Sequence, residues 1–199
     1  MTSKTTTPIP TAMHEPRLGG TAGVAAAALL VLTTILTQMA PIGSHYKSTT
    51  DYLHQVVLAL AYAAVLVTLV GAHARQRPSH RYGLLGTLGT VLTLVSYGVV
   101  LVVVTAGIMM NGRVLDDARL AAAAVLLVGS GLLGVATLRA RVLPWWCGAL
   151  LIVAFPLGHF ANQALDGAEG LILAMLWGSL GSALLKRPSE AAGRPSLRM

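Results

Sequence analysis

Two groups of polar side chains, each at the end of an apolar segment, are the residues of this chain best suited to chemistry. Asp51 and His54 are three positions apart, which on a helix puts them on one face and lets the carboxylate orient the imidazole. The second group, from His159 to Asp166, falls within two helical turns. With one further glutamine, these groups define a candidate polar pocket: Gln38, Asp51, His54, Gln55, His159, Asn162, Gln163 and Asp166.

A bound metal ion, haem or polar substrate is the most specific hypothesis for this pocket. Zinc accepts imidazole and carboxylate ligands, and haem iron can take two axial histidines, so His54 and His159 are the metal candidates. In the simpler interpretation, each side chain lies at the end of a membrane-spanning segment, at the level of the lipid headgroups. There it bonds to water, backbone or a neighbour. Polar residues mark function most strongly deep in a bilayer, and these lie near its boundary. The sequence favours the simpler interpretation for the histidine pair and names no cofactor.

Motifs of simple catalysis are missing from the sequence. The single cysteine, Cys147, can form neither an intrachain disulfide nor a CxxC pair. The chain contains no phosphate-binding glycine loop, no HExxH helix and no GxSxG nucleophile turn. These absences lean against an enzyme without deciding the matter.

Six apolar runs separate the polar residues and predict how they are positioned. The chain has 199 residues, of which 55% are hydrophobic and 11% charged, where a soluble domain carries about 25% charge. A membrane-spanning helix needs about 20 mostly apolar residues, so we expect an all-α bundle of six transmembrane helices. The runs are approximately Gly20–Ala40, Tyr52–Ala72, Tyr82–Met110, Leu120–Leu138, Leu143–Ala161 and Gly170–Leu185.

The charges in the gaps predict the orientation of this bundle. Eleven of the 14 Lys and Arg residues fall in the two tails and in the gaps after the second and fourth runs. Basic residues stay on the cytoplasmic side, so both termini are expected in the cytoplasm of a bacterium, with a multi-pass domain at 19–186 in its plasma membrane. Segments 1–18 and 187–199 are expected to be mobile tails. Charges spread over short loops do not indicate nucleic-acid binding.

Within the runs the sequence predicts contacts rather than charge chemistry. No Lys, Arg, Asp or Glu lies inside a run, which argues against a charge-based relay or pump. Gln38 needs a partner and is expected to face the bundle interior. Small residues at Gly83, Gly86 and Gly89, and at Gly178 and Ser182, favour close helix packing. These helix contacts are expected within the bundle or between the two copies of a homodimer. The other expected partners are membrane lipid and another membrane protein.

The segment Leu138–Ile152, LRARVLPWWCGALLI, resembles a turn found in small multi-spanning membrane proteins of unknown function from actinobacteria. The shared features are an Arg-rich turn, a V-L-P-x-W motif and an apolar helix. The resemblance implies a plasma-membrane location in a high-GC bacterium. It carries no functional residues across to this chain.

Three function classes follow from the sequence. The first is an accessory, regulatory or small-molecule-handling envelope protein, favoured by the missing catalytic motifs. The second is a membrane-embedded enzyme or a haem- or metal-binding protein that acts on a hydrophobic substrate through the polar pocket. The third is a small transporter, for which Pro156 inside the fifth run is the one hint of a broken helix.

Overall fold

A computed structural model describes residues 14–39, 46, 48–111 and 116–186 of the chain. These residues form six α-helices and, within the described ranges, no strand. All six helices are long and apolar enough to cross a membrane, which confirms the predicted all-α class and the number of spans. The helices are α1 (His14–Met39), α2 (Thr49–Gln76), α3 (Gly83–Met110), α4 (Asp116–Ala140), α5 (Trp145–Ala164) and α6 (Ala168–Leu185).

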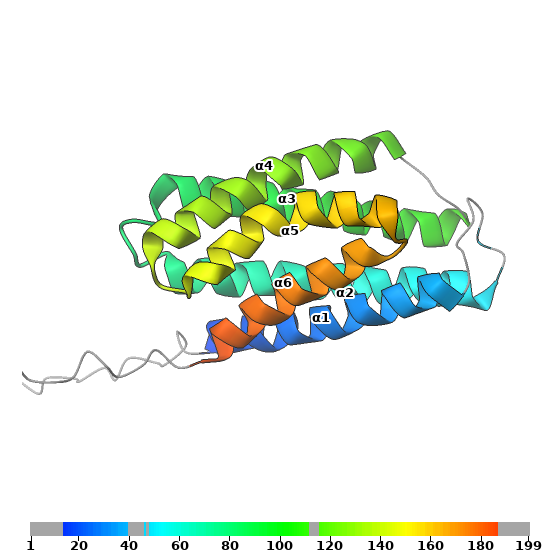
Figure 1. Cartoon of the computed structure of the whole chain (residues 1–199), viewed down its shortest axis with the longest axis horizontal. Coiled ribbons are helices and arrows are strands. Elements are labelled where there is room, and N and C mark those ends of the chain that lie inside the picture. Colours follow the sequence, from blue (N-terminus) through cyan, green and yellow to red (C-terminus); the bar gives the residue numbers. More distant parts are fainter. Residues whose placement is uncertain (1–13, 40–45, 47, 112–115, 187–199) are drawn as a thin grey trace, which may run out of the picture.

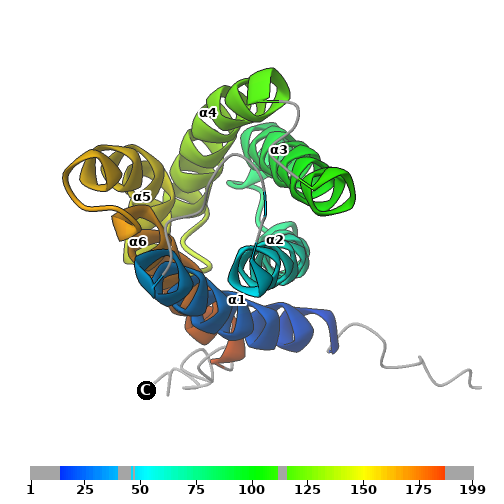
Figure 2. The ribbon, with the colours of Figure 1, turned by 90° about the vertical axis from the view of Figure 1, so that its right-hand side faces the viewer.

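Helix α1 begins inside the segment 1–18 that the sequence assigns to a tail, whereas 1–13 and 187–199 lie outside the described residues. Figure 2 shows the six helices arranged in chain order around a ring, which closes where α6 packs against α1 and α2. The start of α1 and the end of α6 lie together (Figure 1). We call this the terminal end of the bundle, and the opposite end the distal end.

Glycines bring the helix backbones close together. A Cβ on Gly23 in α1 would lie 2.7 Å from Cα of Gly181 in α6. Likewise, a Cβ on Gly89 in α3 would lie 2.5 Å from the backbone nitrogen of Leu133 in α4. A glycine at a helix crossing lets the two backbones come into van der Waals contact. Such contact is the main attraction between helices when lipid is the solvent. Gly89 therefore packs within the bundle, while Gly83 meets no neighbour there and begins α3 with a φ of 49°.

The terminal half of the bundle is filled by side chains. Tyr97 of α3 lies where this half borders the distal half. Its ring contacts those of Tyr62, Phe155 and Trp177, with centroids 5.5, 6.3 and 5.6 Å away. Trp177 is fully buried, and many buried aliphatic residues pack with this aromatic cluster. At the terminal end, Nη1 of Arg75 donates hydrogen bonds to the last carbonyls of α6, at 3.0 and 2.8 Å. This half is therefore a packed core.

Unequal helix lengths leave the distal half less complete. Helices α2 and α3 each have 28 residues, whereas α5 has 20 and α6 has 18. Because the helices pack together at the terminal end, the turn between α5 and α6 stops short of the distal ends of α2 and α3 (Figure 1). Helix α5 continues through Pro156 as one helix. The recessed turn thus borders a space that the longer helices surround.

Candidate functional site

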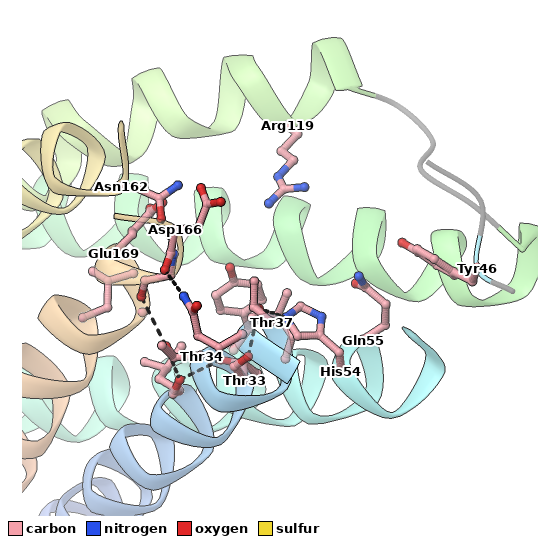
Figure 3. Close-up of a pocket in the computed structure, with 17 residues that line it drawn as sticks. Thr33, Thr34, Thr37, Tyr46, His54, Gln55, Arg119, Asn162, Asp166 and Glu169 are labelled. Carbon is pink, nitrogen blue, oxygen red and sulfur yellow. Dashed lines mark hydrogen bonds between the residues drawn. The ribbon is translucent and has the colours of Figure 1, made fainter. Parts of the chain in front are cut away.

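A cavity of about 500 Å³ lies in the distal half of the bundle, beside the recessed turn (Figure 3). Its walls come from α1, α2, the start of α4 and the α5–α6 turn, and most of its side chains are polar. This volume is within the usual range for small-molecule sites, about 300–1,000 Å³. The polar side chains that line it are Thr33, Thr34, Thr37, Gln38, Tyr46, His54, Gln55, Tyr62, Arg119, Asn162, Asp166 and Glu169.

The α5–α6 turn is held in place by side chains of its own and of α1. The backbone N–H of Gly167 donates to Oδ1 of Asn162 at 2.8 Å, which closes the turn. Gly167 has a φ of 83°, a left-handed conformation that favours glycine. From α1, the amide nitrogen of Gln38 donates to the carbonyl oxygen of Asp166, and the hydroxyl of Thr34 donates to that of Gly167 at 3.3 Å. Gln38 thus has a hydrogen-bond partner, as the sequence predicts, but its side chain is exposed at the cavity wall and does not lie in the bundle interior.

Two glycines let the first turn of α6 fit between its neighbours. A Cβ on Gly170 would clash with the hydroxyl oxygen of Thr34, so only glycine lets α6 approach α1 this closely. On the other side, Gly158 of α5 leaves room for Glu169, whose Cγ would lie 3.2 Å from a Cβ at that position. Glu169 is therefore placed between α5 and the cavity by its neighbours on two helices.

The depth of Glu169 follows from helix geometry. Gly71 of α2 packs against Gly19 at the terminal end, and α2 continues from there to Thr49, about 33 Å at a rise of about 1.5 Å per residue. Leu185 of α6 packs against Gly20 at the same level, and α6 extends from there to Glu169, about 24 Å. Glu169 therefore lies about 9 Å below the distal end of α2. The sequence places this residue in a loop, because the shortness of the sixth helix shows only by comparison with the others.

Charges of both signs line the cavity. Arg119 extends from α4 toward the opposite wall, where Asp166 comes from the α5–α6 turn and Glu169 from the first turn of α6 (Figure 3). Within the described part of the chain, Arg119 forms no ion pair with either carboxylate. Tyr62 of α2 lines the same cavity. The cavity thus has a basic wall and an acidic wall.

Helix α2 adds neutral polar groups at the level of Glu169. Nε2 of His54 lies 3.2 Å from the hydroxyl oxygen of Thr37, a hydrogen bond that joins α2 to α1. Gln55 is buried and also lines the cavity. Tyr46 lies at the same end, with its ring 5.9 Å from that of Tyr52. These groups can donate or accept hydrogen bonds to a polar ligand.

The structure brings five of the eight residues of the predicted pocket to one cavity and leaves three outside its lining. The five are Gln38, His54, Gln55, Asn162 and Asp166. Asp51 is buried next to the cavity, where its carboxylate accepts the backbone N–H of Ser48 at 2.9 Å and closes the N-terminal capping box of α2. His159 and Gln163 are exposed on α5, with their side-chain nitrogens 3.5 Å apart.

The paired-histidine hypothesis places its two residues in different surroundings. His54 lines the cavity, whereas His159 contacts the ring of Phe160 and lies outside the lining. Among the described residues, no group of three or more His, Cys, Asp or Glu could hold a metal ion. The single cysteine, Cys147, is buried.

Arg119, Glu169 and Tyr62 are among the polar lining residues that the predicted pocket does not include, together with Thr33, Thr34, Thr37 and Tyr46. The first two stand next to predicted helix ends, where they count as loop charges. One sequence signal does point to Glu169: the sixth apolar run is much shorter than the third, so its start must lie deeper in the bundle. Arg119 offers no such signal, because its direction depends on the rotation of α4.

Fold and cavity together define a six-helix integral membrane protein with a charged polar pocket at one end of the bundle. Comparison with known proteins adds no narrower assignment: no family model, no curated protein and no solved structure matches the chain.

Proposed function

We propose that this chain is a small-molecule-binding protein of the bacterial plasma membrane, with both termini in the cytoplasm and its pocket facing outward. The observation that carries the proposal is the cavity in which Arg119, Asp166 and Glu169 meet without an ion pair across it. Charged groups at membrane depth are costly and are kept where they bind or move something, and the depth of Glu169 makes this residue such a group. Arg119 and Asp166 are exposed residues that line the same cavity, and a water-filled or ligand-filled pocket would solvate all three charges.

The distribution of basic residues supports the outward orientation. Among the described residues, the terminal end carries several arginines, including Arg75, Arg77, Arg81 and Arg139, whereas Arg119 is the basic residue of the distal end. Basic residues favour the cytoplasmic side of a membrane. The cavity at the distal end would then be open to the outside of the cell.

The packed terminal half favours binding over passage through the bundle. Below the cavity, Tyr97, Phe155 and Trp177 form a contacting aromatic cluster, and the buried core continues from there to the terminal end. Protein cores of this kind are close-packed and leave few voids larger than a water molecule. A polar solute that enters the cavity therefore meets a closed floor.

A solute screen tests the binding proposal. The purified full chain in maltoside micelles would be unfolded by heat in the presence of small cationic, anionic, zwitterionic and neutral polar solutes. A ligand at 100 times its Kd stabilises a protein by about 2.7 kcal/mol, which should raise the Tm by about 5–10 °C for a chain of this size. We expect at least one solute to do so, and Glu169→Gln to reduce the shift.

Asp117→Asn is the matched control for this screen, because Asp117 is an exposed carboxylate at the start of α4 that does not line the cavity. It should leave the Tm shift unchanged. If no solute raises the Tm, or if Glu169→Gln and Asp117→Asn change the shift equally, the pocket is not a binding site and the proposal fails.

Cysteine labelling tests the orientation separately. Cys147 is buried, so the parent chain should react slowly with a membrane-impermeant maleimide. Intact cells should label Asp117→Cys at the distal end and spare Arg81→Cys at the terminal end until the membrane is permeabilised. The opposite pattern would place the pocket on the cytoplasmic side.

A further inference from the structure

The two walls of the cavity carry opposite charge, and this arrangement specifies a class of ligand. Asp166 belongs to the α5–α6 turn and Glu169 to the first turn of α6, while Arg119 reaches in from α4 (Figure 3). The turn is fixed to α1 by the bonds from Gln38 and Thr34, so the acidic wall is held independently of the basic one. Because no ion pair joins the walls, Arg119 is separated from both carboxylates by more than the 4.0 Å limit of such a pair.

We infer that the pocket binds a zwitterionic group, whose ammonium lies against Asp166 and Glu169 and whose anionic end lies against Arg119. This inference rests on the proposed binding function and names its ligand class. An ammonium donates three hydrogen bonds and a guanidinium donates up to five, so each end of such a ligand finds charge-assisted partners on its own wall. A ligand with both charges pairs with the charged side chains of both walls at once, whereas a simple cation or a simple anion leaves the charge of one wall unpaired.

The count of charges sets the order of preference among ligands. The lining holds two carboxylates and one guanidinium, so a cation without an anionic end should bind more weakly than a zwitterion but better than an anion. Tyr62 also lines the cavity and adds a hydroxyl group that could form a hydrogen bond with the ligand. The cavity of about 500 Å³ has room for a molecule with several bonds between its two charges.

Two sources share this chemistry: a free solute such as an amino acid, and the headgroup of a lipid that carries phosphoethanolamine. Leu120, Leu127 and Val128 of α4, the helix that carries Arg119, are exposed on the outside of the bundle, where the acyl chains of a lipid could lie. The test therefore needs one arm for each source.

The solute arm compares 4-aminobutyrate with its two halves, butylamine and butyrate, by calorimetric titration of the full chain in maltoside micelles. We expect 4-aminobutyrate to bind about 10-fold to 100-fold more tightly than butylamine, since a charge-assisted hydrogen bond contributes a factor of that size. Arg119→Gln should remove this preference by weakening 4-aminobutyrate, and it should not weaken butylamine, because the variant removes a positive charge that repels the ammonium. Glu169→Gln should weaken both 4-aminobutyrate and butylamine.

The lipid arm uses O-phosphoethanolamine as the soluble probe, and bilayer nanodiscs of phosphatidylethanolamine or phosphatidylglycerol. If the ligand is a lipid, phosphatidylethanolamine should raise the Tm relative to phosphatidylglycerol and should block the binding of O-phosphoethanolamine. The Tm difference and the binding of O-phosphoethanolamine should both be lost in Arg119→Gln. Arg139→Gln, an exposed arginine at the terminal end of the same helix, is the matched control and should behave as the parent chain.

The outcomes separate the ligand class from the binding function. If butylamine binds as tightly as 4-aminobutyrate and Arg119→Gln changes neither, the zwitterion inference is overturned while the binding function stands. If neither zwitterionic probe binds and phosphatidylethanolamine gives no shift, the inference is also overturned, and the broader solute screen decides the binding function by itself. A free solute as the source is established if 4-aminobutyrate shows the full pattern and phosphatidylethanolamine does not.

Discussion

Replacing Gly170 with alanine tests how the start of α6 is held against α1. A Cβ at this position would overlap the hydroxyl oxygen of Thr34 and lie 3.5 Å from the carbonyl oxygen of Leu30. To reach ordinary contact, Thr34 or α6 must move by about 1 Å. Overpacking of this kind costs about 1–3 kcal/mol, whereas alanine gains about 0.5–1 kcal/mol over glycine in a helix. We expect Gly170→Ala to lose about 1–2 kcal/mol of unfolding free energy.

Three further variants separate the overlap from other effects of the change. Gly131→Ala is the matched control, because a Cβ on Gly131 of α4 meets nothing within 4 Å. It should be neutral or stabilising by up to about 1 kcal/mol. Thr34→Ala removes the overlapping oxygen and, alone, should cost about 0.5–1.5 kcal/mol for its bonds to Leu30 and Gly167. In the Gly170→Ala/Thr34→Ala double variant, the two losses should overlap by about 1 kcal/mol or more.

The measurement is equilibrium unfolding in mixed micelles, followed by circular dichroism, for the parent chain and the four variants. The same proteins should be titrated with the ligand found in the solute screen, because a shifted α6 moves Glu169 and should weaken binding. The reasoning is refuted if Gly170→Ala is as stable as Gly131→Ala, or if the losses in the double variant simply add. Either result would mean that α6 does not depend on this contact for its position.

Three further changes have definite expected outcomes. Arg75→Gln should lower the unfolding free energy by about 1–3 kcal/mol, since the last carbonyls of α6 lose a charged donor, and the exposed Arg77→Gln should change it little. Gly89→Ala should reduce stability by about 1–3 kcal/mol by separating the α3 and α4 backbones; unchanged stability would contradict the close crossing. Burial raises the pKa of Tyr82, so its contribution to stability is complete below pH 10 and falls as the pH rises through the folded pKa. Unfolding from pH 8 to 12 should therefore show a smaller alkaline loss in Tyr82→Phe, and identical profiles would refute this assignment.

Helix number and approximate bounds could be predicted because they depend on local composition. The run Tyr82–Met110 differs by one residue from α3, since apolar length and flanking polar residues fix where a span begins and ends. Part of the site was also local: Asn162 and Asp166 are one helical turn apart, and Gln38 needed a hydrogen-bond partner. Hydrogen-bonding groups near span ends thus gave a partial outline of the cavity.

Roles that depend on a partner helix could not be predicted. Asp51 suits an imidazole partner by spacing, but its carboxylate also closes the capping box with Ser48. Arg75 counts as an orientation signal in the sequence, yet its guanidinium caps α6. Tyr82 is only the start of an apolar run in the sequence, but in the structure it is buried and shares a hydrogen bond of 2.6 Å with Thr90. The Arg75 contact joins residues 108 positions apart, whose distance is set by how the chain folds back. Ser48 and Asp51 form a local contact, but their spacing does not show which partner the carboxylate takes.

The sequence by itself determined an all-α bundle of six membrane-capable helices with polar side chains gathered near one end. Only the tertiary structure decided that Arg119 and Glu169 belong to the polar residues that line the cavity. The physical reason is that a helix fixes the spacing of its own residues but leaves its rotation and its depth undetermined. Those two quantities are set by contacts between helices, above all where Gly170 meets Thr34 and where Gly23 meets Gly181.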